Sequence, residues 1–133
     1  MQLTDTIGDL LTRIRNSIAV KQEQVLIPYS KMKFNIIKIL KEEGFIRSYE
    51  IVNEGVNKKF ILINLKYDNE GISVISSLKR VSKPSKRIYL KKMNIGKVIN
   101  GFGINVFSTT RGIMTGKQAR IAGIGGELIC EIY

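Results

Sequence analysis

The chain has no histidine and a single cysteine in 133 residues. Histidine is the commonest general base and a common metal ligand, so its absence disfavours proton-transfer catalysis and metal sites. The lone thiol of Cys130 excludes an intrachain disulfide and fits a reducing compartment. Because Cys130 lies in the apolar run 128–132 without a neighbouring base, we expect it to be a structural residue. The sequence thus predicts no enzyme, no metal site and no cofactor.

Long apolar runs and acidic residues are also scarce. No stretch approaches the roughly 18 apolar residues of a membrane span, and the N-terminus lacks a signal-peptide pattern, so we expect a soluble protein of a cytosol-like compartment. The 11 Asp and Glu stand against 22 Lys and Arg, which gives a formal charge of +11. This imbalance indicates a polyanionic partner such as a nucleic acid, without indicating sequence specificity.

The N-terminal half predicts a small lobe, residues 1–69, with the element order α-β-α-β-β. Apolar residues recur at helical spacing from Ile7 to Ile18, after candidate caps at 4–6. A strand at 24–27, a helix at 31–43 that Ser30 caps and Gly44 ends, and strands at 45–52 and 60–67 follow. The last strand alternates, which predicts a sheet packed by the helices on one face.

Two groups of polar residues on these helices have open interpretations. Asp9, Arg13 and Asn16 fall opposite the apolar stripe of the first helix, where they form either a solvated face or a binding ridge. The second helix carries Lys31 and Lys33 in its first turn, where the macrodipole disfavours cations and a bound phosphate would relieve the conflict. We expect its lysines to lie outside the apolar face.

The C-terminal half predicts a mainly antiparallel β lobe, residues 70–133, so that the fold class is α+β with two lobes. We expect a strand at 72–81, a basic turn and a second strand within the Lys- and Arg-rich run 79–92, and a short helical turn at 94–100. A strand at 104–107 follows. Thr115 and Gln118 match a capping box for a helix that ends at Gly123, and the last strand spans 127–133.

Two corners of this lobe carry the candidate site. The first has a row of short hydroxyls at Ser108, Thr109 and Thr110, followed by Arg111 and Gly112, and the second is Gly125-Gly126-Glu127. Short hydroxyls serve only a partner that approaches the backbone closely, which glycine permits. Strand pairing on either side of the short helix could bring the two corners together.

The basic run and Glu127 supply further candidates. Lys86 and Arg87 offer cations, and Tyr89 either stacks under an unpaired base or packs within the sheet. A carboxylate such as Glu127 repels phosphate, so we expect it to accept hydrogen bonds from a base amino group, a ribose hydroxyl or the loop itself, unless it is simply solvated. The corner around Gly125 is not a phosphate loop, because it lacks the Lys-Ser/Thr ending.

Seven blocks in this order resemble the bacterial-type small-subunit ribosomal protein S8 family. The blocks span 5–7, 11–16, 41–46, 80–84, 87–89, 108–115 and 125–130. The resemblance implies a non-catalytic protein of the ribosome, in a bacterium or in an organelle such as a plastid, that folds in two lobes. It also implies binding to an irregular helix in the central domain of small-subunit ribosomal RNA and help in subunit assembly. Neighbouring ribosomal proteins and the protein's own messenger RNA are further partners known in the family.

Carried over by position, the resemblance implies RNA contacts at both ends of the chain. The main set is Ser108, Thr109, Thr110, Gly125, Gly126 and Glu127 with Tyr89, and a second set is Thr4, Asp5, Arg13, Asn16 and Lys31. Arg111, Gly112, Arg87 and Lys86 complete our predicted RNA-binding residues. Ser85 departs from the common glycine, and Thr110 from the usual serine. The alternatives are a basic scaffold for acidic partners and an enzyme acting on RNA.

Overall fold

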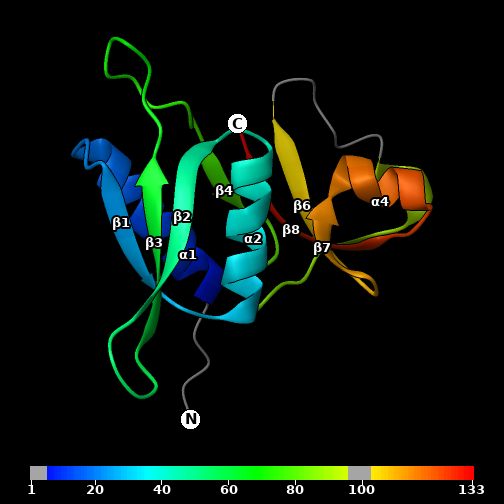
Figure 1. Ribbon diagram of the computed structural model, residues 1–133. Helices are drawn as coiled ribbons and strands as arrows, with labels where there is room; N and C mark the ends of the chain where they lie inside the picture. Colours follow the sequence, from blue (N-terminus) through cyan, green and yellow to red (C-terminus); the bar gives the residue numbers. More distant parts are fainter. Residues whose placement is uncertain (1–5, 96–102) are drawn as a thin grey trace. The chain divides into compact units, whose positions relative to one another are not determined.

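The computed structural model describes residues 6–95 and 103–133. Their contacts divide them into two compact units, one formed by Thr6–Ser76 and the other by the described residues from Ser77 to Tyr133. Each unit contains one antiparallel sheet with helices, which confirms the α+β class (Figure 1). Among the described residues, no helix is long and apolar enough to cross a membrane.

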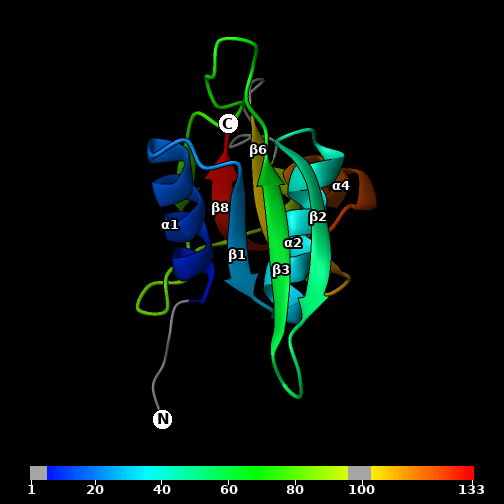
Figure 2. The same cartoon turned by 60° about the vertical axis from the view of Figure 1, so that its left-hand side comes forward.

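The first unit has the predicted order of two helices and three strands. Its elements are α1 (Thr6–Ala19), β1 (Gln24–Pro28), α2 (Lys31–Glu42), β2 (Ile46–Asn53) and β3 (Lys59–Leu65). The strands form a sheet in the order β1-β3-β2, side by side in Figure 2. The side-chain oxygen of Ser30 accepts a hydrogen bond from the backbone nitrogen of Lys33 at 3.2 Å, so Ser30 is the predicted N-cap of α2.

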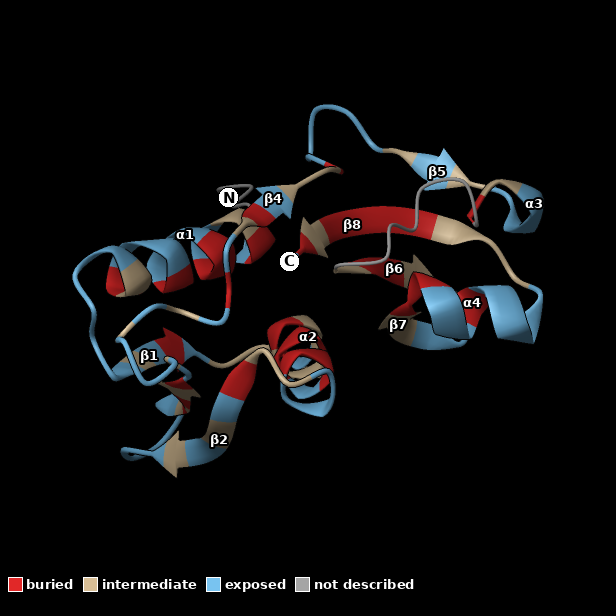
Figure 3. Ribbon diagram, turned by 90° about the horizontal axis from the view of Figure 1, so that it is seen from above, coloured by how far each residue is buried: buried red, intermediate tan, exposed pale blue. Residues whose placement is uncertain are grey.

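The strand register separates the two faces of this sheet. One face carries the buried residues Ile27, Ile61 and Ile63, and α1 and α2 lie on that side of β1 and β2 (Figure 3). The other face has three rows in register across β1, β3 and β2: Gln24, Asn64 and Ser48; Leu26, Leu62 and Glu50; Pro28, Phe60 and Val52. We call these nine residues the outer face.

Lys33 contradicts the expectation that the lysines of α2 lie outside its apolar face. Only 5% of its surface is exposed. Position 33 precedes Ile36 and Ile37 by three and four residues, so it shares their face of the helix. Burial lowers the pKa of the Lys33 ammonium, the charge of Asp9 on α1 opposes that change, and Arg13 adds to it. The helix α2 therefore buries the aliphatic part of Lys33 next to Asp9 and Arg13 of α1.

The second unit contains a five-stranded sheet whose central strand is the last one. Its elements are β4 (Leu78–Arg80), β5 (Tyr89–Leu90), α3 (Lys92–Ile95), β6 (Ile104–Thr109), β7 (Gly112–Thr115), α4 (Gly116–Ala122) and β8 (Gly126–Ile132). The order is β4-β8-β6-β7, and β5 also pairs with β8. Ile95, Phe107, Ala119 and Leu128 form a buried core between the sheet and the helices.

Several local predictions in this unit are confirmed. Thr115 and Gln118 exchange the two hydrogen bonds of a capping box, and Gly123 ends α4 with a φ of 70°. The thiol of Cys130 is buried, and burial raises its pKa to about 12. It is thus the structural residue that the sequence indicated.

Three elements differ from the prediction. The strand expected at 72–81 is wrong except for β4, because Asp68 and Ser73 accept hydrogen bonds from the backbone nitrogens of Ile72 and Ile75, respectively. Those bonds replace part of a strand ladder. The strand β7 was not predicted, since a four-residue strand next to a glycine gives little periodicity. The helix α3 starts at Lys92, earlier than the expected 94, and 96–100 lie outside the described residues.

Candidate nucleic-acid interface

A row of three side chains crosses three strands of the second unit. Glu127 on β8 is in register with Tyr89 on β5 and with Ser108 on β6. Residues directly opposite each other in an antiparallel sheet project to the same face. Phe107 and Leu128, also in register, project to the buried core on the other face. The row therefore joins both predicted corners and the basic run at one place.

A bulge in β8 is what aligns this row. Val106 pairs with Cys130 while the next residue, Phe107, pairs with Leu128, so Ile129 is the extra residue on β8. Without that extra residue, Ser108 would stand opposite Leu128, and a hydroxyl would share a face with a core side chain. The bulge thus places Ser108 and Glu127 on the face away from the core.

Gly125 and Gly126 are required by the protein's own backbone. A Cβ atom on Gly126 would lie 2.4 Å from the carbonyl oxygen of Ser108, and one on Gly125 would lie 2.4 Å from that of Leu90. Real Cβ atoms do not approach so closely, so β5, β6 and β8 could not pair in this way with larger residues. The glycines that we interpreted as room for a partner therefore serve the sheet first.

The hydroxyls of the first corner have different roles. Thr109 Oγ1 donates to the carbonyl oxygen of Gly112 at 2.8 Å and accepts from the backbone nitrogen of Arg111 at 3.1 Å, closing the β6–β7 hairpin. Gly112 has a φ of 105°, which a side chain would strain. Thr110 and Arg111 are exposed at the tip, and Ser108 is half-buried. Thr109 shapes the loop, whereas Ser108 and Thr110 present their hydroxyls.

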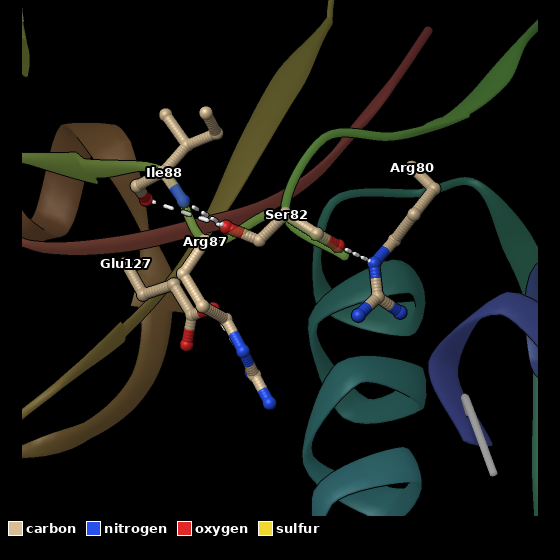
Figure 4. A network of polar contacts seen from close by, with 5 residues as sticks. All are labelled: Arg80, Ser82, Arg87, Ile88 and Glu127. Carbon is tan, nitrogen blue, oxygen red and sulfur yellow. Dashed lines mark hydrogen bonds and ion pairs between the residues drawn. The ribbon is translucent and has the colours of Figure 1, made fainter. Parts of the chain in front are cut away.

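Glu127 is held by an arginine from the basic run. Arg87 Nη1 lies 3.0 Å from Glu127 Oε2, and the side chains are 49% and 11% exposed, respectively (Figure 4). A largely buried carboxylate with a charged donor is a fixed hydrogen-bond acceptor. The cation also offsets a charge that would repel phosphate. This arrangement excludes the interpretation of Glu127 as a simply solvated residue.

Ser82, which the sequence reasoning missed, fixes the loop that carries Arg87. Its buried hydroxyl accepts from the backbone nitrogen of Ile88 at 2.8 Å and donates to the carbonyl oxygen of the same residue at 3.3 Å (Figure 4). The carbonyl oxygen of Ser82 accepts from Arg80 Nε. A serine inside a basic run gives no signal of burial. Its place within block 80–84, one of those that carry the family resemblance, was the available hint.

The loop between β4 and β5 closes as a tight turn. Lys83 and Lys86 exchange both backbone hydrogen bonds at 2.9 Å. Ser85, at the position where a glycine is common, does not have a positive φ. The turn therefore accepts serine, and Lys86 is exposed beside Arg87.

The row Tyr89–Glu127–Ser108 borders an open hollow of about 430 Å³. Its lining contains Tyr89, Ser108, Thr109, Thr110, Gly125, Gly126 and Glu127. Tyr89 is 69% exposed, so its ring presents surface to solvent and is not packed within the sheet. The hollow offers an aromatic face, hydroxyls and an anchored carboxylate to an incoming ligand.

The predicted residues of the first unit form a separate group. Asp9 Oδ2 and Arg13 Nε make a 2.9 Å ion pair on the exposed side of α1, and Asn16 and Lys31 are exposed. Thr4 and Asp5 lie outside the described residues. The two groups belong to different units, and each is described by itself.

Comparisons with known proteins agree on one family. A profile of the family described as "Ribosomal protein S8" matches residues 5–133. The protein named "Small ribosomal subunit protein uS8" from Thermodesulfovibrio yellowstonii is 53% identical over 131 residues, covering 98% of this chain and 99% of the relative. Proteins of the same name from Clostridioides difficile and Halothermothrix orenii are each 50% identical over 133 residues and the full length of both chains.

Proposed function

Because the chain belongs to the ribosomal protein S8 family, we propose that its second unit binds an irregular helix in the central domain of small-subunit ribosomal RNA. The chain is a structural, non-catalytic protein of the small ribosomal subunit. The observation that carries the RNA proposal is the in-register row Tyr89–Glu127–Ser108 beside an open hollow, in a chain with a charge of +11. Binding there assists assembly of the subunit.

The chemistry of the row suits RNA that is not a regular duplex. A-form RNA hides its base edges in a deep, narrow groove, so specific readers use splayed bases and the 2′-hydroxyls of the wide groove. The exposed ring of Tyr89 can stack under a splayed base, a contact of about 1–3 kcal/mol. The hydroxyls of Ser108 and Thr110 are short enough to select ligands that fit the hollow closely.

Glu127 supplies a fixed hydrogen-bond acceptor for the recognition of irregular RNA. Arg87 engages Oε2, so the carboxylate is oriented toward donors such as a base amino group or a ribose hydroxyl. We expect Glu127→Gln to reduce the preference for the irregular helix about tenfold, since an uncharged amide is a weaker acceptor. Arg87→Lys keeps the charge but loses the planar fork, so it should have an intermediate effect. Unchanged binding of both variants would mean that Glu127 does not contribute to the preference for the irregular helix.

Equilibrium binding across a salt series tests the proposal. One RNA is a short small-subunit hairpin with the irregular internal loop, and the other is a fully paired hairpin of equal length. The affinity that comes from phosphate contacts falls as salt rises, and each contact adds about 0.7–0.9 to the slope of log affinity against log salt concentration. Contacts to bases and 2′-hydroxyls maintain the preference for one RNA over the other. A preference that persists as salt rises supports RNA reading. Affinities that converge would favour the alternative of a basic scaffold without specificity.

Two finer proposals use the same assay. A messenger segment that folds into the same irregular helix should compete for the hollow, which would permit feedback on the chain's own synthesis. The exposed α1 edge with Arg13, Asn16 and Lys31, preceded by Thr4 and Asp5, is proposed to contact a second RNA segment. Arg13→Ala should then leave hairpin binding intact and weaken binding only to a longer RNA.

A further inference from the structure

The first unit has a hollow of its own, of about 310 Å³, at one end of its sheet. The first residues of β1 and β2 and the last residues of β3 meet at that end (Figure 2). Hollows of roughly 300–1,000 Å³ are the size that small ligands occupy. Charged and polar side chains predominate in the lining, which contains Glu23, Gln24, Arg47, Asn64, Leu65, Tyr67 and Asp68. We call this space the polar hollow.

A bulge in β2 places Arg47 at the polar hollow. The residue before Arg47 pairs with Leu65 and the residue after it pairs with Asn64, the next residue along β3, so Arg47 is the extra residue. Bulges commonly re-aim a side chain beside a functional site. Arg47 is exposed, and in the part of the chain that the structure describes it makes no ion pair with either carboxylate of the hollow. Its guanidinium is therefore available to a ligand.

Two carboxylates complement this arginine. The backbone oxygen of Glu23 accepts from the backbone nitrogen of Leu65 at 2.8 Å, so Glu23 lies beside the end of β3, across that strand from Arg47. Because neighbouring strands lie about 4.8 Å apart, the backbones of Glu23 and Arg47 are separated by about 10 Å. Asp68, in the turn after β3, is the second carboxylate. The hollow thus has a cation at one edge of the sheet and an anion at the other.

Tyr67 adds an aromatic ring whose position is fixed. Its hydroxyl donates to the backbone oxygen of Gln22 at 2.6 Å, and its backbone forms a bridge with Ser73. Burial and the nearby charge of Glu23 raise the pKa of this hydroxyl, so the hydrogen bond keeps its proton at neutral pH. The ring is half-buried. An aromatic ring that borders a hollow can stack on the face of a planar ligand.

The neutral polar side chains of this end bind one another. Gln24 Nε2 donates to Asn64 Oδ1, and Asn64 Nδ2 donates to Ser48 Oγ, each at 2.8 Å. These bonds fix the amides beside the hollow. Recognition of a ligand therefore falls to the charged groups and the ring.

We propose that the polar hollow binds an unpaired guanine base. Guanine has two adjacent acceptors, O6 and N7, which an arginine engages with two hydrogen bonds. Its Watson–Crick edge carries the donors N1–H and N2–H₂, and a carboxylate has two oxygens that accept them. Arg47 and Glu23, on opposite sides of β3, match these two edges. Tyr67 provides the stacking surface.

The same chemistry disfavours other ligands. Adenine has a donor at N6 where guanine has O6, and it has no donor at N1, so it would oppose a donor to the arginine and an acceptor to the carboxylates. Two carboxylates outnumber the single arginine in the lining, which keeps phosphate groups outside the hollow. An unpaired guanine occurs both in RNA and in free guanine nucleotides. The proposal concerns the first unit alone and does not depend on RNA binding by the second.

Amide NMR of the full chain locates the ligand. Guanosine monophosphate should shift the signals of Gln24, Asn64 and Asp68 and leave those of Ser108 and Glu127 unchanged. Adenosine monophosphate is the matched control and should bind at least tenfold more weakly. Shifts confined to the second unit, or equal binding of the two nucleotides, would overturn the proposal.

Substitutions test the assigned groups. Glu23→Gln, which replaces one acceptor oxygen by a donor, and Arg47→Lys, which loses the planar fork, should each weaken binding of guanosine monophosphate about tenfold. Glu50→Gln is the matched control, because Glu50 is an exposed carboxylate on β2 that does not line the hollow, and it should change binding by less than about twofold. All three variants should keep the preference for the irregular hairpin. Unchanged nucleotide binding by Glu23→Gln and Arg47→Lys would contradict the guanine site, whereas loss of hairpin preference in the unchanged chain would contradict only the RNA proposal.

Two further hairpins identify the source of the base. They are of equal length and fully paired except for one unpaired guanosine or one unpaired adenosine. If RNA supplies the base, the guanosine hairpin should bind about tenfold more tightly, and Glu23→Gln should remove that difference. If a free nucleotide is the ligand, the two hairpins should bind equally while guanosine monophosphate still binds the hollow. A chain that prefers neither the guanosine hairpin nor guanosine monophosphate would overturn the proposal.

Discussion

The two sheets share one construction and differ in the chemistry of their open faces. Each is antiparallel and covered by helices on one side. The five-stranded sheet presents Tyr89, Glu127 and Ser108, with exposed Lys86 and Arg87 nearby. The three-stranded sheet presents Leu26, Leu62 and Phe60, with Glu50 as its charge. Each sheet therefore leaves one face open, and the two open faces differ in the chemistry of their side chains, which is where function resides.

This difference also shows that net charge is a poor guide to a single surface. A charge of +11 indicates a polyanion for the whole chain. The net charge does not indicate that the outer face of the three-stranded sheet lacks cations. It also does not indicate that the face proposed to bind RNA has a carboxylate at its centre. Four predictions test the difference between the two sheets.

The largest effect should distinguish the two sides of β3. Ile63 is fully buried against the helices, and Ile63→Ala should lower the free energy of unfolding by roughly 2–5 kcal/mol. Leu62, the adjacent residue on the outer face, should cost only about 1 kcal/mol or less when changed to Ala. Denaturant unfolding measures both. Similar losses would mean that the outer face is already packed within the isolated chain.

A smaller loss is expected at the glycine beside Ser108. Gly126→Ala places a Cβ 2.4 Å from a carbonyl oxygen and should cost about 1–3 kcal/mol of stability and most of the preference for the irregular hairpin. Gly55→Ala is the control, because Gly55 has a φ of 119° but no atom within 4 Å of the added Cβ. That variant should lose stability and keep RNA binding. If Gly126→Ala retains full binding, the β6–β8 spacing is not part of the site.

The third prediction distinguishes Thr109, which closes the hairpin turn, from Ser108, which presents its hydroxyl to the hollow. Thr109→Ala should weaken binding to the irregular hairpin about tenfold by loosening the hairpin turn, with little change in salt slope. Thr109→Ser keeps both hydrogen bonds and should restore binding. Ser108→Ala has no turn bond to break, so a loss there reports contact with RNA itself. Lys86→Ala should instead lower the salt slope by about 0.7–0.9. A serine that fails to rescue Thr109→Ala would contradict the turn role.

The smallest effect concerns the buried thiol of β8. Burial raises the pKa of Cys130 from 9.0 to about 12, so the folded chain keeps a proton that the unfolded chain loses. The resulting stability is fully present below pH 9 and is lost as pH rises from 9 toward 12, by up to about 1.4 kcal/mol per pH unit. Half a unit above pH 9, the stability difference between the unchanged chain and Cys130→Ala should shrink by less than about 1 kcal/mol. Denaturant unfolding at pH 8 and 9.5 measures this change, and a constant difference would mean that the thiol titrates normally.

Local signals in the sequence were sufficient for much of the fold. Ser30 and Thr115 are short hydroxyl residues at helix starts, and Gly123 permits a left-handed helix end, so their effects depend on neighbours within a few residues. The failed strand at 72–81 shows the limit of such reasoning. Its apolar residues resemble a strand, but Asp68 accepts a hydrogen bond from the backbone nitrogen of Ile72, which a strand ladder would otherwise use.

The sequence singles out the residues of the candidate site, but it does not predict their arrangement. Arg87 and Glu127 are separated by 40 residues, and nothing in the run 79–92 indicates which cation meets the carboxylate. Ser108 faces Glu127 because of one extra residue in β8, and an uninterrupted register would have reversed that face. Bulges and long-range pairs depend on the packed sheet, which no window of sequence contains.

The central position of β8 has a consequence for the order in which the site can form during synthesis. β4, β5 and β6 all pair with this strand, which is made after them. A growing chain that has not reached Gly126 carries the hydroxyl loop and the basic run but has nothing to align them. Since chains fold from the N-terminus as they are made, the first unit can form early, whereas the row Tyr89–Glu127–Ser108 must wait for β8. If this row binds RNA as we propose, a nascent chain cannot present the complete site before β8 has emerged.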